Sequence, residues 1–458
     1  MKTKTQHGRR LWNALMLLGL ILPLLAACGG AADTPAASTS PAAAASASSA
    51  PSTPAATESS APSASVAPSD APASASPAAS PSASATAEAA ASDAPPQTSG
   101  NPNIPDKLQY GAVGTLYYTD AERVLTLTDI AGFDWVRQQV QWRETEVADR
   151  TFGFQELDNI VNTVAAHNKK LLLSLVKSPD WATGRAGDNG LPQNNADFAR
   201  FARAVAERYK GKLQAIEVWN EQNLAVENGG QVTAEDAGRY VELLKAAYTE
   251  IKAVDPTIVV IAGALSSTGV TEINTAVDDI TYYKAMYTYN GGEIKNYMDA
   301  QGFHPAAALN PPDTLWPDEP GPGCAEGNRW CDSRTHYFRH IEDVRQVMID
   351  NGLQDKQVWI TELGWATQNN TPGYEYGNSI SLDQQADYLE GALFRTLTQY
   401  EYVGVVFIWN LNFAITWGQA GNPQHEQAAF GLLNPDWSPR PSFTRVQGFI
   451  NAVRTQGQ

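Results

Sequence analysis

Two glutamates in the sequence stand where short hydrophobic runs end, a place where a carboxylate needs a chemical reason. Glu221 follows the run Ala215–Asn220, and Glu362 follows the run Gln357–Thr361. Two facing carboxyl groups, one protonated and one ionised, are the apparatus of glycosidic bond hydrolysis. The acid donates a proton to the leaving oxygen, while the carboxylate attacks the anomeric carbon or activates a water molecule. The competing interpretation is a pair of glutamates on surface loops.

The elements that must position these glutamates alternate between strand and helix patterns. Short runs of continuous hydrophobicity, typical of strands buried on both faces, are each followed by a helical pattern. They comprise Leu108–Val113, Asp134–Gln138, Lys170–Val176, Ala215–Asn220, Thr257–Ala264, Ala300–His304, Gln357–Thr361 and Gly404–Trp409. Eight such units without a glycine-rich nucleotide loop predict an α/β fold, a single (β/α)8 TIM barrel. The barrel rule places chemistry at the carboxyl ends of the strands, which is where both glutamates stand.

Helical periodicity between the strand patterns supports this prediction. One apolar stripe comprises Phe198, Phe201, Val205 and Tyr209, and another comprises Phe443, Val446, Ile450 and Val453. Ser381 and Gln384 have the spacing of a capping box at the start of a third helix.

The N-terminus has the features of an export signal. Four basic residues precede an apolar run over 11–27 that is too short and wrongly flanked for a stable membrane span. The run ends in Ala-Ala and is followed by Cys28, which resembles a bacterial lipobox. We therefore predict a lipoprotein signal peptide over 1–27 and lipidation of Cys28, with the protein exported and anchored by lipid at the cell surface or facing the periplasm. An ordinary signal peptide with an incidental cysteine is the alternative.

A low-complexity segment separates this signal from the globular part. Residues 31–100 contain 62 Ala, Ser, Pro or Thr among 70 positions, with no aromatic residue. Such a composition cannot bury enough apolar surface to offset chain entropy. We predict a disordered tether over 28–103 and one catalytic domain over 104–458. The formal net charge of −17 argues against a nucleic-acid partner.

Export changes how the remaining cysteines are interpreted. Cys324 and Cys331 lie seven residues apart outside a reducing cytosol, so a local disulfide is expected. Two cysteines alone are too few for a metal site. His336 and His340 have a metal-ligand spacing, but no glutamate follows His336, and a solvated helix face is favoured. We expect no metal and no cofactor.

Both glutamate contexts resemble those of clan A glycoside hydrolases, with families 39 and 5 the most similar in character. These families are (β/α)8 barrels with an acid/base Glu after Asn on the fourth strand and a nucleophile Glu ending the seventh. The first motif resembles Trp219-Asn220-Glu221, and the second resembles Thr361-Glu362-Leu363-Gly364-Trp365. The resemblance covers about residues 105–455. Gln222 stands where the family usually has Pro, which leaves the particular family open.

The resemblance implies roles for other strand-end residues. It implies retention of configuration, with Glu221 as acid/base, Glu362 as nucleophile and carboxyl groups about 5–5.5 Å apart. Asn220 would bond the sugar 2-hydroxyl, with a strand-end cap as the alternative. Arg137 would keep Glu362 ionised, with a structural ion pair as the alternative. His304 would be the polar residue of the sixth strand, or else a core histidine with its hydrogen bonds satisfied. Trp409 would be the flat aromatic platform on which the sugar ring stacks. The alternative is that it packs in the barrel core. We also expect an aromatic-lined cleft from tryptophans just after strands, namely Trp142, Trp181, Trp365 and Trp417.

The leading interpretation is a monomeric, surface-anchored retaining β-glycosidase acting on a polysaccharide or oligosaccharide, with Trp181 among its substrate-binding residues. A non-catalytic carbohydrate-binding lipoprotein on the same fold is the alternative, and a transporter's solute-binding lipoprotein fits the lipobox but not the strand-end glutamates. The sugar, the linkage and endo or exo action are not encoded in these patterns, because loop variation on this fold decides them.

Overall fold

The computed structural model of the protein describes residues 100–317, 324 and 328–457. The predicted signal peptide, Cys28 and all but the last four residues of the predicted tether lie outside the described residues.

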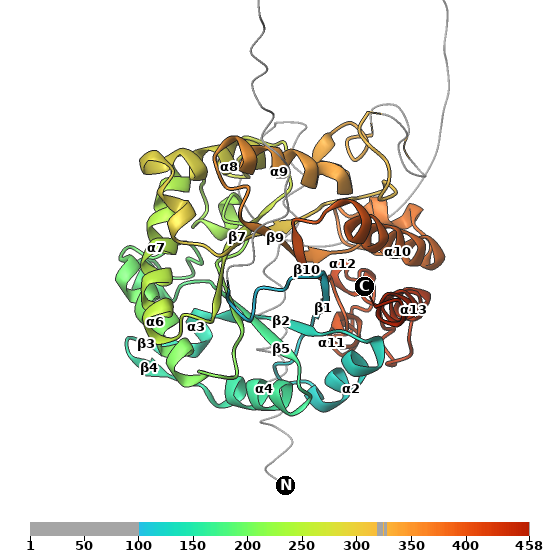
Figure 1. The fold of residues 1–458 in the computed structure, drawn as a ribbon, viewed down its shortest axis with the longest axis horizontal. Helices are drawn as coiled ribbons and strands as arrows, with labels where there is room; N and C mark the ends of the chain where they lie inside the picture. The colour runs from blue at the N-terminus through green and yellow to red at the C-terminus, as the bar shows by residue number, and fades with distance from the viewer. Residues whose placement is uncertain (1–99, 318–323, 325–327, 458) are drawn as a thin grey trace, which may run out of the picture. The chain divides into compact units, whose positions relative to one another are not determined.

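Eight parallel strands close into a barrel in chain order, which confirms the predicted (β/α)8 fold (Figure 1). The barrel strands are β1 (Gln109–Val113), β2 (Trp135–Gln141), β5 (Lys170–Val176), β6 (Ala215–Val218), β7 (Val259–Ser266), β8 (Ala300–His304), β9 (Gln357–Leu363) and β10 (Val403–Ile408). All eight predicted strands are present, and their ends differ from the expected ones by at most three residues. Parallel pairing of β1 with both β2 and β10 closes the ring.

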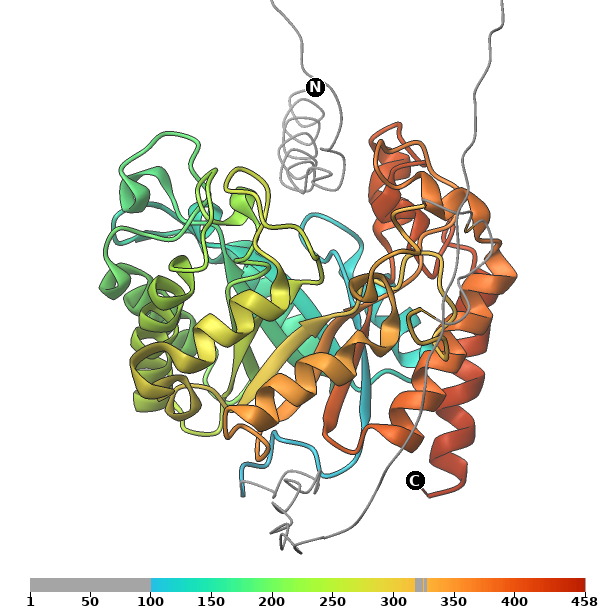
Figure 2. The same cartoon turned by 90° about the horizontal axis from the view of Figure 1, so that it is seen from above.

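A ring of helices covers the outside of the barrel (Figures 1 and 2). Its members are α2 (Ala121–Ala131), α4 (Gln155–Ala166), α6 (Asn195–Arg208), α7 (Asp236–Val254), α8 (Asp279–Thr288), α9 (Ile341–Asp350), α10 (Leu382–Gln399) and α13 (Pro441–Thr455). Both predicted apolar stripes are buried, on α6 and α13. The predicted capping box of Ser381 and Gln384 opens α10.

Shorter elements lie in the connections between the strands and the helices of the ring. They are α3 (Trp142–Thr145), α5 (Asp180–Thr183), α11 (Phe413–Gln419), α12 (Glu426–Ala429) and the 3-10 turns η1 (Ala225–Glu227), η2 (Tyr289–Gly291), η3 (Glu293–Asn296), η4 (Arg334–His336), η5 (Phe338–His340) and η6 (Glu375–Ser379). A two-stranded antiparallel hairpin, β3 (Glu146–Ala148) and β4 (Thr151–Phe152), was not expected from the sequence, because its strands are too short for a periodic signal.

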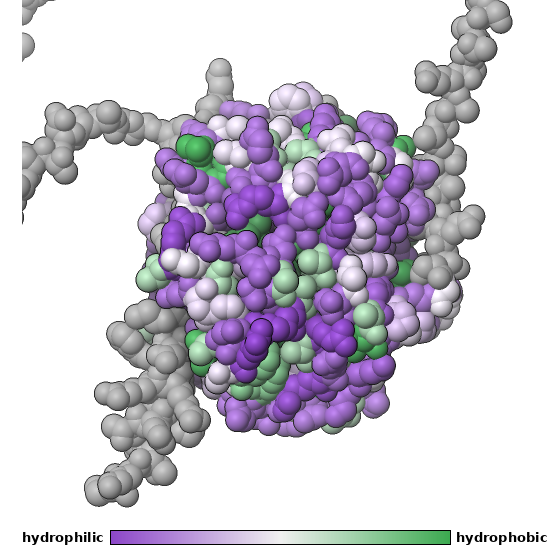
Figure 3. Space-filling model, turned by 90° about the vertical axis from the view of Figure 1, so that its left-hand side faces the viewer, coloured by the Kyte–Doolittle hydropathy of each residue, from purple (hydrophilic) through white to green (hydrophobic). Residues whose placement is uncertain are grey.

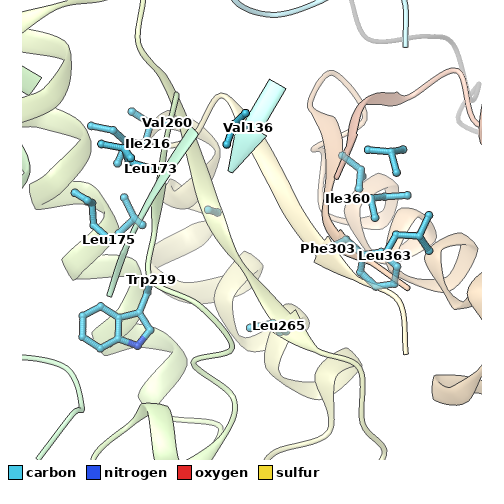
Figure 4. Packing of buried hydrophobic residues seen from close by; sticks show 14 of the residues in the cluster. Val136, Leu173, Leu175, Ile216, Trp219, Val260, Leu265, Phe303, Ile360 and Leu363 are labelled. Carbon is cyan, nitrogen blue, oxygen red and sulfur yellow. The ribbon is translucent and has the colours of Figure 1, made fainter. Parts of the chain in front are cut away.

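The strands are buried on both faces, as their continuous hydrophobicity predicts. Outward-facing side chains such as Leu173, Ile216 and Val260 pack under the helices (Figure 4). Inward-facing side chains form a separate cluster inside the barrel, where the rings of Trp135 and Trp359 meet edge to face at 5.0 Å. This inner cluster closes the amino-terminal part of the barrel and leaves the carboxyl end for polar residues.

The face drawn in Figure 3 is mainly hydrophilic, with hydrophobic residues scattered over it. In the described part of the chain, no helix is both long and apolar enough to cross a membrane. The predicted disulfide between Cys324 and Cys331 is present, with Cα atoms 5.9 Å apart. It closes a loop in the insert between β8 and α9.

His336 and His340 differ from the sequence expectation of a solvated helix face. They end the short turns η4 and η5, and both are buried. Nε2 of His340 lies 2.8 Å from the buried carboxylate of Asp279 on α8. This carboxylate gives the imidazole a structural partner that spacing alone could not reveal.

Candidate active site

A buried ion pair forms the floor of the site. Arg137 points inward from β2 and donates from Nε to the Oε2 atom of Glu217 on β6 at 2.8 Å. Both side chains are fully buried. Thr361 on β9 donates its hydroxyl to the other oxygen of Glu217 at 3.0 Å. The pair is therefore hydrogen-bonded on several sides, as a buried charge pair requires.

Inward-facing positions two residues apart explain how this polar layer arises. Trp135 and Arg137 share the inner face of β2, as do Ala215 and Glu217 on β6, because strand side chains alternate. The first of each pair belongs to the apolar inner cluster, and the second belongs to the polar layer above it. The barrel interior thus changes from apolar to charged toward the carboxyl ends of the strands.

The other nitrogens of Arg137 connect this floor to the catalytic candidates. Nη1 donates to Oε1 of Glu362 at 2.7 Å, and Nη2 donates to Oδ1 of Asn220 at 2.9 Å. The guanidinium has a rigid fork of donors that holds several oxygens at once. Arg137 therefore fixes Glu362 on β9 and Asn220 beyond β6 relative to each other.

Glu221 reaches the site because the chain turns sharply after β6. Trp219 and Glu221 both have positive φ values, 71° and 49°. Such values are uncommon for residues other than glycine, cost of order 1 kcal/mol or more each, and cluster at functional sites. The turn is held by the N–H of Glu221, which donates to the carbonyl of Ala264 at 2.7 Å, and by the Trp219 indole, which donates to the carbonyl of Glu227 at 3.0 Å.

His304 at the end of β8 lies between the two candidate carboxylates. Its Nδ1 is 3.2 Å from Oε1 of Glu221, and its Nε2 is 3.8 Å from Oε1 of Glu362. The two glutamate side chains are 19% and 17% exposed, so both border open space while the imidazole beneath them is buried. Glu221 and Glu362, predicted from separate strands, thus meet around one side chain.

The electrostatics of the site follow from burial and from this clustering of charge. Burial raises the pKa of Glu362 above its ordinary value, while the nearby charges of His304 and Arg137 act to lower it. Burial alone would lower the pKa of His304, but the charge of Glu362 and the contact with Glu221 raise it overall. A charged imidazole is therefore favoured beside the two carboxyl groups.

Three polar atoms at the site have no partner among the described residues. They are Oε2 of Glu362, Oε2 of Glu221 and Nδ2 of Asn220, while the companion atom of each is hydrogen-bonded to Arg137 or His304. Each group is thus oriented through one atom and available through the other. An oriented carboxylate oxygen, an oriented acid and an amide donor are the groups that the predicted chemistry needs.

These groups border a pocket with about 940 Å³ of open space, including solvent at its mouth. Its walls are aromatic, contributed by Trp330, Trp365, Tyr374, Tyr376, Trp409 and Phe430. Gly364 also lies on the wall, where a side chain would collide with the carbonyl of Trp409. A pocket that is mostly apolar with a few placed polar groups is typical of small-molecule and sugar sites.

The predicted tryptophans divide between the pocket and the core. Trp409 and Trp365 line the pocket, as expected. Trp142 and Trp417 are buried instead, where Trp142 stacks on Phe201 and Trp417 donates to Oε1 of Gln427.

Trp181 does not line the pocket that contains the two glutamates, contrary to its predicted place. It packs edge-on against Trp142 at 5.4 Å and donates its N–H to the carbonyl of Glu146 on the unexpected hairpin. Its exposed part borders a separate hollow beside Arg143 and Asp180. The hairpin after β2 gives Trp181 this structural partner.

Several site residues were not selected from the sequence. Glu217 could have been found from the alternation of side chains along β6, because a charged residue within a buried strand must face the polar interior of the barrel. Trp330, Tyr374 and Tyr376 lie on connections without periodicity, and Glu426 and Gln427 lie on the four-residue helix α12. Residues on loops and very short helices have no hydrophobic periodicity that would place them in the fold. Their position at the pocket is therefore seen only in the folded structure.

In residues 100–317, 324 and 328–457, no group of three or more His, Cys, Asp or Glu side chains has the arrangement of a metal site.

Comparisons with known proteins give a family match and a shared fold. A family model described as cellulase (glycosyl hydrolase family 5) matches residues 97–413. No curated protein is detectably similar to the chain in sequence.

Three solved structures illustrate the shared fold. A family 39 glycoside hydrolase from the gut symbiont Bacteroides cellulosilyticus WH2 is 18% identical, with a TM-score of 0.55, over 77% of this chain and 64% of that one. A glucosidase from Croceicoccus marinus is 12% identical, with a TM-score of 0.52, over 76% and 68%. The exo-beta-1,4-mannosidase Op5Man5 from Opitutaceae bacterium strain TAV5 is 14% identical, with a TM-score of 0.51, over 76% and 60%. The chain thus covers less than two thirds of the first and third, and these likenesses establish the barrel fold alone.

Proposed function

Because the chain belongs to glycosyl hydrolase family 5 and is a glycosidase, we propose that it is a retaining β-glycosidase that works by double displacement, with Glu362 as nucleophile and Glu221 as acid/base. The observation that carries the proposal is the placement of both carboxyl groups around His304 at the rim of one pocket. Each keeps one oxygen free of protein partners in the described structure, as attack and proton transfer require.

The first step uses these two oxygens together. Oε2 of Glu362 attacks the anomeric carbon and forms an ester bond to the sugar, while the bond from that carbon to the leaving oxygen breaks. Glu221 donates its proton to the leaving oxygen, which departs as an alcohol. Arg137 holds the other oxygen of Glu362, which directs the free oxygen toward the pocket.

The second step returns the enzyme to its starting state. Glu221, now ionised, takes a proton from water, and the oxygen of that water attacks the anomeric carbon. The bond to Glu362 breaks, and the sugar is released with its original configuration. Nδ2 of Asn220 is available to donate to the sugar 2-hydroxyl, a contact that strengthens in the transition state.

The substrate proposed is a polysaccharide or oligosaccharide. The aromatic walls support this, because flat rings such as the indole of Trp409 suit the C–H faces of pyranoses. We also propose that the protein is exported and anchored through lipidated Cys28, on the strength of the lipobox in the sequence. The proposed acting form is a monomer.

The test is hydrolysis of a panel of aryl β-glycosides with the anomer of the first-formed product read by NMR. The proposal expects turnover of at least one β-glycoside with a β-anomer as the initial product. An α-anomer would contradict retention. Sugar binding without turnover of any glycoside would instead favour a non-catalytic carbohydrate-binding protein on the same fold.

A further inference from the structure

A third carboxylate lines the active-site pocket, and the two-step reaction does not use it. Glu426 lies on α12, after β10, and its side chain is 3% exposed. The hydroxyl of Thr371 donates to its Oε2 at 2.8 Å, and Nδ1 of His425 lies 2.7 Å from the same oxygen. Within the described structure Oε1 has no partner. Glu426 is thus oriented through one oxygen, in the same way as Glu362.

The next residue, Gln427, supplies a buried donor that also lacks a partner. It lines the same pocket and is 2% exposed. Its Oε1 accepts from the Trp417 indole at 3.1 Å, which fixes the orientation of the amide because the indole can only donate. Its Nε2 is therefore the free end of the amide, and it is buried with no hydrogen bond in the described structure. A buried amide donor without a partner is costly unless a ligand completes it.

Asn410 connects this pair to the end of the eighth barrel strand. Asn410 follows Trp409, and its Nδ2 donates to the carbonyl of Gln427 at 2.8 Å. The pair is thus tied to the strand end that carries the proposed sugar platform. An acceptor and a donor on adjacent residues, beside an aromatic face, match sugar hydroxyls, each of which can donate and accept.

We propose that Glu426 and Gln427 form a specificity-determining pair that binds hydroxyl groups of the sugar, so that the enzyme selects glycosides of neutral, fully hydroxylated sugars. The inference rests on the proposed glycosidase function and names its substrate class. Glu426 accepts a hydrogen bond from a sugar hydroxyl, and Gln427 donates to the same or the neighbouring hydroxyl.

The charges around the pocket support a neutral sugar rather than a uronate. Its walls carry Glu221, Glu362 and Glu426, and no Lys or Arg is among the described residues that line it. Arg137 is fully buried beneath, where it is shared between Glu217 and Glu362. The imidazole of His304 is the cation of the pocket, and it already lies between Glu221 and Glu362, so a sugar carboxylate would meet three carboxyl groups without a further compensating cation, which disfavours its binding. An ammonium group on the sugar is also disfavoured, because it has no lone pair with which to accept a hydrogen bond from the Gln427 amide.

The test compares neutral and charged glycosides and then deletes single hydroxyls. Dinitrophenyl β-glycosides of glucose, mannose, xylose, galactose and glucuronic acid are assayed first, and then monodeoxy forms of the best substrate. We expect the glucuronide to be the poorest. Glu426→Gln should lower kcat/KM on the best substrate by roughly 10- to 100-fold, the range for a hydrogen bond to a charged group. Glu375→Gln, an exposed carboxylate on η6 outside the pocket lining, is the control and should change nothing.

The decisive result is coupling between the glutamate and one hydroxyl. For one monodeoxy substrate, Glu426→Gln should cause little further loss, because the contact is already gone. An unchanged kcat/KM, or an equal loss on every deoxy substrate, would overturn the pair. Gln427→Glu keeps the acceptor for Trp417 and replaces the Nε2 donor with a carboxyl oxygen beside Glu426, so it gives a second variant if the first unfolds.

Binding separates failure of this inference from failure of the proposed function. The affinities of cello-, manno- and xylo-oligosaccharides are measured by tryptophan fluorescence for the wild type and Glu426→Gln. Binding that weakens in the variant supports the pair even if the wild type hydrolyses nothing, a result that would contradict only the glycosidase mechanism. Equal binding by both proteins overturns the pair even if hydrolysis is normal.

Discussion

Nη1 of Arg137 lies 2.7 Å from Oε1 of Glu362, and this contact leaves only the other carboxylate oxygen facing the pocket. The arginine is itself held by Glu217 at the opposite edge of its guanidinium. The orientation of the proposed nucleophile on β9 therefore depends on a charge three barrel strands away, on β6. The predictions below test each part of this arrangement.

The two glutamates should differ in kinetics, because their proposed roles differ. Glu362→Ala cannot form a glycosyl-enzyme, so it should lose turnover on every glycoside. Glu221→Ala should still be glycosylated by a dinitrophenyl glycoside, whose phenolate leaves without a proton, and should then stall. Added azide should restore Glu221→Ala with a β-glycosyl azide product, whereas azide with Glu362→Ala should give the α-azide. NMR of the products measures this, and near-native activity in both variants would refute the assignment.

The pH dependence should report the environment of Glu362. Burial raises the pKa of this carboxyl group above the ~4.3 of an ordinary glutamate. As the pH falls, the nucleophile therefore becomes protonated, and activity is lost, at a higher pH than an ordinary glutamate would give. His304→Gln removes the charge that most lowers this pKa, so the acidic limb of kcat/KM should move to still higher pH. His167→Gln, beside Glu122 and Asp129 on the surface, should leave the limb in place. A limb that stays or moves to lower pH in His304→Gln would contradict the proposed role.

Glu217 should matter for stability more than a surface glutamate does. Glu217→Gln leaves the buried guanidinium of Arg137 without its full counter-charge, which typically costs ~3–5 kcal/mol. Glu390→Gln breaks an exposed pair with Arg445 and should change the free energy of unfolding by ~0.5 kcal/mol or less. Urea denaturation compares the two, and equal effects would show that the buried pair contributes no more than the surface one.

The disulfide should affect the pocket wall more than the barrel. Cys324→Ser should reduce the free energy of unfolding by ~2–3 kcal/mol at most, because the loop it closes is short. Trp330 lies next to Cys331 and lines the pocket, so KM should rise while far-UV circular dichroism keeps its barrel spectrum. Non-reducing peptide mapping should find one linked peptide in the exported protein, and two freely alkylated thiols would refute the bond.

Cys28 should decide where the protein resides. Replacing it by Ala should release the protein from the membrane fraction or block its processing, because the proposed lipid is attached there. Fractionation and intact mass provide the measurement, and no change in either would contradict the anchor.

The surroundings of Trp181 show how a connection without a sequence signal changes where a residue lies. Trp181 lies after β5, as predicted. Its indole N–H donates to a carbonyl of the hairpin β3–β4, and its ring borders a hollow separate from the pocket that contains the two glutamates. A strand of two or three residues leaves no period in the sequence, so the hairpin and its effect on Trp181 could not be anticipated.

The sequence by itself determined the barrel, the order of its strands and the two strand ends that carry Glu221 and Glu362. These follow from hydrophobic runs and helical stripes, which are local patterns that a chain must have to bury both faces of parallel strands. The pairing of Cys324 with Cys331 was equally local, because the two are seven residues apart.

The tertiary structure alone decided which side chains share the pocket. His304 meets both glutamates, Arg137 joins β2 to β6 and β9, and Glu426 arrives from a short helix beyond β10. These contacts join residues far apart in the chain, and they form only when the barrel closes and the loops pack above it. A local pattern places a residue at a strand end, whereas its partners depend on the geometry of the closed ring.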